Sequence, residues 1–148
     1  QRLLKIKDLI TEENFMLTYS DDICDVDLND MQKYFNRLKK IGMLVTVPYR
    51  SDYGILITDS FTDSKVVGPV IEYQEKPILD EQINGGYYIF NKKIFNYINE
   101  NLDFEKYTLP LLMRDNELYA YKHTGFWKYI NTLKDVIELQ ENERLLEK

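Results

Sequence analysis

The sequence is poor in cysteine and histidine, with one residue of each, Cys24 and His123. A lone cysteine excludes an internal disulfide and a cysteine-based zinc site, and it is typical of a reducing compartment. His123 has no cysteine or catalytic-triad pattern near it, so we expect a packed or solvated side chain. No apolar run approaches the roughly 18 residues of a membrane helix, and the first residues lack the apolar core of a signal peptide. These absences predict a soluble, cytoplasmic protein.

Positive charge is also scarce, because 19 lysines and arginines face 25 aspartates and glutamates, which leaves a net charge of −6. No basic cluster offsets this excess, so nucleic acid and anionic membranes are disfavoured as partners. Hydrophobic residues are plentiful and make up 44% of the chain. A chain of this length can bury about 68–70% of its unfolded surface around one core. With no repeat and no linker in the sequence, we expect a single domain over 1–148.

Hydrophobic periodicity predicts an alternation of strands and helices. Residues 14–19 predict a buried strand, 30–41 a helix and 43–47 a second strand, which together make a βαβ unit and imply a parallel sheet. Other elements are expected in the remaining chain: strands at 54–58, 65–73, 83–90, 117–123 and 126–130, and helices at 2–10, 91–99, 105–115 and from a capping box at Thr132 to about 147. The order predicts an α/β fold with a mixed, mainly parallel sheet and flanking helices.

The helix expected at 30–41 has candidate caps at both ends. Asp27 or Asn29 could accept its first amide hydrogens, and Gly42 could end it. Its inward face is expected to consist of apolar residues at helical spacing: Met31, Tyr34, Phe35, Leu38 and Ile41.

Four carboxylates follow the strand at 14–19, within the segment 21–27. Ligands of open α/β sheets bind at the carboxyl ends of strands, and magnesium typically uses one or two carboxylates together with substrate phosphates. An EF-hand is excluded, because Asp30 stands where the calcium loop needs glycine. Asp25 and Asp27 fit a solvated helix entry better than a metal site. For Asp21, metal binding and simple solvation remain equally open.

Three further segments contain candidate ligand-binding residues, and each of them also has an ordinary structural explanation. Lys76 precedes a proline, which should hold it in an extended segment where it can meet a phosphate; a surface lysine is the more frequent case. Asn84 and the glycine pair after it start the strand at 83–90 and should leave backbone amides open to a ligand; a bulge explains them equally well. Trp127 lies near a strand-to-helix junction that favours anions, although interior packing is its common fate.

These segments occur in a characteristic order: 15–21, 53–56, 75–77, 83–86, 104–105 and 125–132. Over nearly the whole chain this series resembles the sugar-1-phosphate nucleotidyltransferases, most closely their glucose-1-phosphate cytidylyltransferase subgroup. The resemblance implies a Rossmann-like, GT-A-like fold. It also implies transfer of a nucleotidyl group, CMP from CTP, to a sugar 1-phosphate such as glucose 1-phosphate, with Mg²⁺ and release of pyrophosphate.

The resemblance assigns roles to particular side chains. It implies that Asp21 and Lys76 are catalytic, that Asp21 and Asn131 are the magnesium ligands, and that Lys76 holds the sugar phosphate. The other implied substrate-binding residues are Arg2, near the nucleotide phosphates, Asn84, Gly86 and Glu105, which contact the sugar, and Ser20 and Trp127.

The sequence departs from the family pattern at three places. It has no N-terminal glycine-rich loop for the triphosphate. The motif at the metal is Ser20-Asp21-Asp22 rather than Gly-Asp-Gly, and Asn131 stands where the family has aspartate. Asparagine offers a carbonyl oxygen but no charge, so we expect a weakened or rearranged magnesium site.

The missing loop suggests the later portion of a nucleotidyltransferase domain. We expect such a chain to be inactive unaided, and to associate as a homo-oligomer or with the missing N-terminal portion, because an incomplete sheet exposes an edge. The alternative is a non-catalytic module that keeps the fold for sugar-phosphate binding or for assembly.

Overall fold

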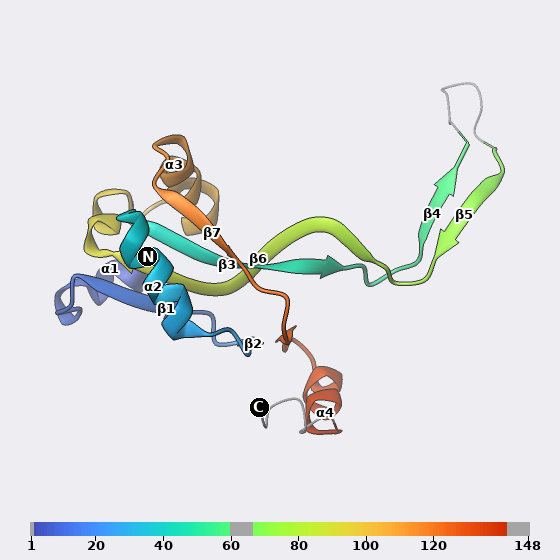
Figure 1. Ribbon diagram of the computed structural model, residues 1–148, viewed down its shortest axis with the longest axis horizontal. Coiled ribbons are helices and arrows are strands. Elements are labelled where there is room, and N and C mark those ends of the chain that lie inside the picture. Colours follow the sequence, from blue (N-terminus) through green and yellow to red (C-terminus); the bar gives the residue numbers. More distant parts are fainter. Residues whose placement is uncertain (1, 60–66, 142–148) are drawn as a thin grey trace. The chain divides into compact units, whose positions relative to one another are not determined.

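The computed structural model describes residues 2–59 and 67–141 (Figure 1). The chain forms two compact units: the first joins Gln1–Val47 to Asn84–Lys148, and the second is Pro48–Ile83. The prediction of one domain over the whole chain stays a prediction. Within the described ranges, no helix has both the length and the apolar character needed to cross a membrane.

The order of elements is close to the predicted alternation. The helices are α1 (Arg2–Lys5), α2 (Leu28–Leu38), α3 (Leu109–Arg114) and α4 (Leu133–Glu141), with 3-10 turns at Lys7–Leu9 and Lys92–Asn96 and a π-helical turn at Phe104–Thr108. The strands are β1 (Asn14–Thr18), β2 (Asp22–Cys24), β3 (Gly42–Arg50), β4 (Ile55–Thr58), β5 (Val70–Gln74), β6 (Ile78–Asn91), β7 (Leu118–Lys122) and β8 (Trp127–Tyr129).

The main sheet has the strand order β1-β6-β3-β7. β3 and β7 pair in parallel, with Gly42 opposite Leu118, whereas β1 and β6 pair antiparallel, with Asn14 opposite Asn91. The mixed sheet is therefore confirmed. The βαβ order had suggested a parallel neighbour for β1, and this is wrong because β6 lies between β1 and β3.

Aromatic side chains of β6 form the centre of the core. Tyr88 and Phe90 are fully buried and stack with their ring centroids 5.4 Å apart, and Phe15 of β1 lies 6.2 Å from Phe90. The buried cluster around them comprises Leu3, Ile41, Tyr88, Phe90, Ile94, Phe95, Leu109 and Leu112. Its members are spread from position 3 to position 112, so the sheet and the turns after β6 share one core.

The structure selects one of the two caps that the sequence offered for α2. The Asp27 carboxylate accepts a hydrogen bond from the Asp30 amide at 2.9 Å, so Asp27 is the N-cap. Of the five residues predicted to face inward, Met31, Phe35 and Ile41 are buried, whereas the prediction is wrong for Tyr34 and Leu38, which are exposed. The helix ends earlier than expected, at Lys39, whose φ of 52° is left-handed. Gly42 instead begins β3. Glycine is needed there because an added Cβ would lie 2.8 Å from the Phe90 ring.

The remaining predicted helices are shorter or of another type. The helix over 2–10 divides into α1 and a 3-10 turn, and the one over 91–99 is a 3-10 turn capped by the Asn91 side chain. The segment 105–115 begins as a π-helical turn before α3. The capping box is confirmed, since the Thr132 amide donates to Asp135 at 2.8 Å, while the predicted end near 147 lies outside the described residues.

The unit Pro48–Ile83 contains the predicted antiparallel pair, β4 and β5, with Ile55 opposite Gln74. The first residues of the strand predicted over 65–73 fall outside the described part of the chain. All residues of β5 are exposed, including Val70, Ile71 and Tyr73. A two-stranded sheet with its apolar side chains exposed has little stability of its own.

Candidate functional site

A cavity of 840 Å³ lies where β1 ends. Four of the residues singled out in the sequence line it: Arg2 from α1, Ser20 and Asp21 from the turn after β1, and Glu105 from the π-helical turn. The rest of its wall is Leu3, Leu17, Thr18, Tyr19, Leu102, Asp103 and Phe104. The fold thus brings together residues that are more than a hundred positions apart in the sequence.

The two predicted metal ligands lie at neighbouring strand ends. β2 pairs antiparallel with β8. Asp21 directly precedes β2 and Ile130 directly follows β8, and the Ile130 amide donates to the Asp21 carbonyl oxygen at 2.7 Å. Asn131 is the next residue, and its amide donates to Asp135 of α4 at 3.1 Å. In the described part of the chain, no three histidine, cysteine or acidic side chains are grouped so as to hold a metal ion. The two positions therefore offer one carboxylate and one amide carbonyl.

Asp22 is a second carboxylate at this end of the sheet. Burial, and then the adjacent carboxylate of Asp21, raise the pKa of Asp22 above its ordinary value. The two side chains differ in exposure to solvent: Asp21 is exposed and Asp22 is half-buried. Of the two, Asp21 is the more accessible to a cation.

The glycine pair lies inside β6 rather than at the start of a strand, because β6 begins at Ile78. The Gly86 amide donates to the Asn84 side-chain oxygen at 3.0 Å and so is occupied, contrary to the open amide that we expected. Gly86 has a φ of 76°, and a Cβ there would overlap the carboxylate of Asp22. The indole Nε1 of Trp127 donates to the Gly85 carbonyl at 3.0 Å, which ties β8 to this part of β6.

A chain of hydrogen bonds joins Asn84 to Glu105. The Asn84 amide group donates to the Tyr88 hydroxyl, Tyr88 donates to the Tyr19 hydroxyl at 3.0 Å, and Tyr19 donates to the Glu105 carboxylate. The two ends of this chain, Asn84 and Glu105, were predicted from the resemblance, whereas the two tyrosines between them were not. The signals were present: Tyr19 directly precedes the Ser20-Asp21 motif, and Tyr88 shares a strand face with Asn84 at the two-residue period.

Both tyrosines are held in the neutral form. Burial, and then the hydrogen bond to Glu105, raise the pKa of Tyr19 far above its ordinary value. Burial also raises the pKa of Tyr88. Two neutral hydroxyls can therefore act as hydrogen-bond donors throughout the usual pH range.

Comparison with known proteins identifies the family. Residues 1–144 match the family described as Nucleotidyl transferase. The chain belongs to this family. It is 31% identical over 94% of its length to a glucose-1-phosphate cytidylyltransferase of Salmonella typhi, of which it covers 52%. It is also 32% identical over 88% of its length to mannose-1-phosphate guanyltransferase beta-A of Xenopus laevis, of which it covers 37%.

Solved structures share the fold of this nucleotidyl transferase chain. It matches a UDP-glucose pyrophosphorylase complexed with UDP-glucose at a TM-score of 0.64 and 18% identity, over 96% of this chain and 60% of that one. It matches HddC from Yersinia pseudotuberculosis at a TM-score of 0.61 and 22% identity, over 94% and 59% of the two chains. The predicted GT-A-like fold is confirmed. The chain spans about half the length of the cytidylyltransferases it matches.

Lys76 belongs to the unit Pro48–Ile83, which is described by itself. Its φ is 46°, so the expectation of an extended conformation is wrong. A following proline favours extended backbone at the residue before it, but this preference does not decide the conformation of Lys76. Arg50 donates to the Lys76 carbonyl at 3.3 Å, and the Ser51 amide donates to the Pro77 carbonyl at 2.9 Å. The role of Lys76 stays a prediction.

The remaining acidic residues of the segment 21–27 have structural partners. Asp27 caps α2, and Asp25 lies 2.9 Å from Nε2 of His123. His123 also contacts the Phe126 carbonyl at 3.2 Å and is largely buried. The packed alternative for His123 is therefore confirmed, whereas Asp25 is paired rather than only solvated.

Proposed function

We propose that this chain is the acceptor-binding part of a sugar-1-phosphate nucleotidyltransferase, in which a sugar 1-phosphate attacks the α-phosphorus of a nucleoside triphosphate and releases pyrophosphate. One observation carries the proposal: the hydrogen-bond chain from Asn84 ends on Glu105, in the cavity that Arg2 and Asp21 also line. This arrangement combines hydroxyl recognition with groups suited to phosphate and metal.

The reaction asks mainly for positioning and for neutralisation of phosphate charge, because two polyanions must approach in line. In the proposed site, Glu105 accepts hydrogen bonds from sugar hydroxyls and Asn84 contributes at the other end of the chain. Arg2 supplies positive charge for phosphates. The phosphate-binding role of Lys76 is carried by the family resemblance alone. Ser20, Gly86 and Trp127 shape the site, Trp127 through its hydrogen bond to the Gly85 carbonyl.

A magnesium ion fits this proposal as a cofactor. Magnesium is bound by oxygen atoms, commonly one or two carboxylates completed by substrate phosphates and water. Asp21 and Asn131, at neighbouring strand ends, offer such a donor pair. When bound, the ion would neutralise phosphate charge. Asp21 would supply the only formal charge of the pair, which makes a weak site without substrate.

CTP and glucose 1-phosphate are the proposed substrates. Support comes from the similarity to glucose-1-phosphate cytidylyltransferases at 31% identity over 94–95% of the chain. A mannose-1-phosphate guanyltransferase is similar at 32% identity over a smaller share of the chain, 88%. The sugar is tested first, because the residues proposed to contact it are all in the described chain.

Glucose 1-phosphate with Mg²⁺ should raise the melting temperature of the purified chain. A ligand that binds only the folded form at a hundredfold excess over its Kd stabilises it by about 2.7 kcal/mol. The comparison set is galactose 1-phosphate, mannose 1-phosphate, free glucose, inorganic phosphate and CTP. A shift with one sugar 1-phosphate and none with free glucose or phosphate supports the proposal. Equal shifts with phosphate alone, or no shift with any sugar 1-phosphate, contradict it.

A second candidate function is a non-catalytic module that serves only in assembly. The neutral Asn131 at a predicted metal ligand favours it, because the loss of one charge weakens a magnesium site. The melting experiment separates the two functions. An assembly module should show a melting temperature that depends on protein concentration but not on sugar phosphates.

Restoring the carboxylate should strengthen the metal site. We expect Asn131→Asp to bind Mg²⁺ about tenfold more tightly, a net gain of about 1.4 kcal/mol. The Coulomb attraction of unit charges 4 Å apart near a protein surface is about 4 kcal/mol, and desolvation offsets much of it. Isothermal titration calorimetry would measure the affinity. Asn36→Asp on α2 adds the same charge elsewhere and is the control; equal Mg²⁺ affinity in both variants would count against the site.

A further inference from the structure

Tyr88 lies at the centre of the site without reaching the cavity. Its side chain is 1% exposed, and it is absent from the cavity wall, which Tyr19 and Glu105 both line. Its ring stacks on Phe90 at 5.4 Å and meets the edge of Phe104 at 6.4 Å. Phe104 directly precedes Glu105 in the π-helical turn. Tyr88 thus contacts the turn that holds the cavity carboxylate.

The hydrogen bonds through Tyr88 run in one direction only. The Gly86 amide donates to the Asn84 oxygen at 3.0 Å, which turns the Asn84 amino group toward Tyr88. Tyr88 accepts this hydrogen and donates its own to Tyr19 at 3.0 Å, and Tyr19 donates to Glu105. Each hydroxyl accepts one hydrogen bond and donates one, so each bond polarises the next.

We propose that Tyr88 is a positioning residue, which sets affinity and selectivity for the sugar by orienting the Glu105 carboxylate through Tyr19. This inference rests on the proposed function, because it takes the sugar 1-phosphate as the ligand of the cavity. Tyr19 engages one carboxylate oxygen of Glu105. The other carboxylate oxygen of Glu105 can accept a hydrogen bond from a sugar hydroxyl. Because both oxygens belong to one carboxylate, the side-chain torsions of Glu105 that Tyr19 fixes also set the direction of this second oxygen.

Removing the Tyr88 hydroxyl isolates this effect from packing. Tyr88→Phe keeps the ring contacts with Phe90 and Phe104, but Tyr19 loses its donor and the Asn84 amino group loses its acceptor. Tyr19 can then turn away from Glu105, and the carboxylate loses its fixed orientation. A single neutral hydrogen bond of this kind corresponds to about a three- to tenfold change in affinity.

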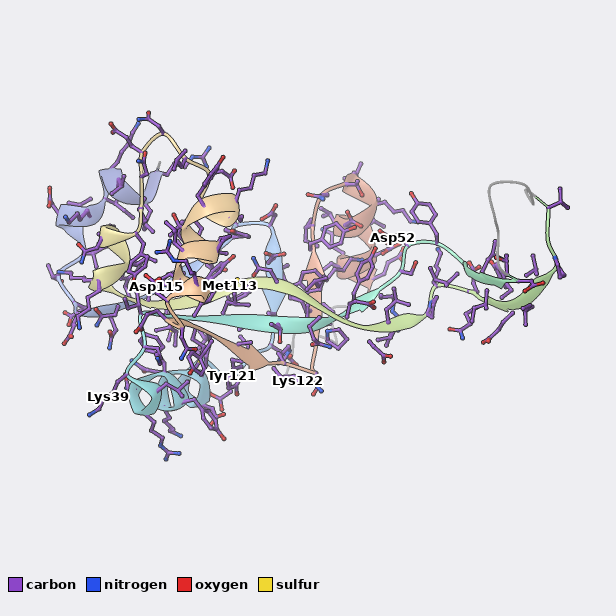
Figure 2. All side chains as sticks on the ribbon, turned by 90° about the horizontal axis from the view of Figure 1, so that it is seen from above. Lys39, Asp52, Met113, Asp115, Tyr121 and Lys122 are labelled. Carbon is purple, nitrogen blue, oxygen red and sulfur yellow. The ribbon has the colours of Figure 1, made fainter. Side chains whose placement is uncertain are left out.

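The test measures binding of glucose 1-phosphate, galactose 1-phosphate and mannose 1-phosphate to the full chain in the presence of Mg²⁺ by calorimetry. We expect Tyr88→Phe to weaken binding of the preferred sugar about three- to tenfold and to reduce its preference over the other two. The control is Tyr121→Phe. Tyr121 of β7, which is labelled in Figure 2, also donates its hydroxyl to a carboxylate, that of Asp30 on α2 at 2.8 Å. Neither residue lines the cavity. Removal of the Tyr121 hydroxyl should leave affinity and selectivity unchanged.

A double-mutant cycle distinguishes positioning from general destabilisation. If Tyr88 acts through Glu105, Tyr88→Phe should have little further effect on affinity once Glu105→Gln is present. Unchanged affinity in Tyr88→Phe, or effects that multiply in the double variant, would overturn the inference.

The proposed function can fail separately. If the unmodified chain binds none of the three sugar phosphates, the function is wrong, and hydrogen exchange of the ligand-free chain then tests the positioning role. Faster exchange at residues 104–108 in Tyr88→Phe, but not in Tyr121→Phe, would support the link between Tyr88 and the π-helical turn. Equal exchange in both variants would overturn it.

Discussion

Gly86→Ala should destabilise the fold by about 2–4 kcal/mol, the effect expected of a side chain placed in a left-handed position against a packed neighbour. The φ of 76° alone carries about 1–2 kcal/mol of strain for an L-residue. The added methyl group would also overlap the carboxylate of Asp22. Urea unfolding followed by circular dichroism would measure the loss.

Two further variants separate the two causes. In Gly86→Ala combined with Asp22→Ala, the carboxylate no longer meets the methyl group. The backbone strain of about 1–2 kcal/mol should remain, together with a close contact of 3.1 Å between the new methyl group and the Cβ of residue 22. Asp22→Ala alone provides the reference. A Gly86→Ala variant as stable as the unmodified chain would mean that β6 follows another path beside Tyr19, whose amide donates to the Gly86 carbonyl at 3.0 Å.

Leu112→Ala should cost about 2–5 kcal/mol, because it leaves a cavity in the core that holds Tyr88 and Phe90. Leu112 is 0% exposed. The next residue of the same helix, Met113, is 64% exposed and is the matched control (Figure 2). Met113→Ala should change stability by less than about 0.5 kcal/mol. Thermal and urea unfolding of both variants would measure the contrast, and similar losses for both would contradict the assigned orientation of α3.

Local sequence signals predicted the elements whose stability is local. Asp27 followed by apolar residues at helical spacing predicted α2, and Thr132 with Asp135 predicted the start of α4. The end of α2 was not predictable in this way. Lys39 takes a left-handed conformation that lysine rarely adopts, and Gly42, the better local candidate, is needed in β3 beside the Phe90 ring.

The pairing of strands was beyond the reach of local patterns. Asn14 and Asn91 are opposite each other in β1 and β6 and are 77 residues apart in the sequence. Neither segment carries a local signal that identifies the strand with which it pairs. An apolar run can pair with a parallel or with an antiparallel neighbouring strand. Resemblance to a family, rather than periodicity, placed both segments in one fold.

The sequence named four of the residues that line the cavity, but none of the hydrogen bonds that link the candidate residues to one another. The residues named from the resemblance include Arg2, Ser20, Asp21 and Glu105, and the structure gathers these four around one cavity. Tyr19 and Tyr88 were missed because a tyrosine in an apolar strand is commonly a core residue. Their proposed roles depend on hydroxyl groups whose hydrogen-bond partners become visible only in three dimensions.

The hydrogen bond between Tyr19 and Glu105 closes a loop of 86 residues. Contacts of such long range form late, because the entropy of loop closure must be met before the contact contributes. The proposed sugar site of a growing chain would therefore be incomplete until the π-helical turn has been synthesised and has docked beside Tyr19. Sugar-phosphate binding would consequently report on completed folding, and a collapsed intermediate with native helices but unpaired strands would not bind.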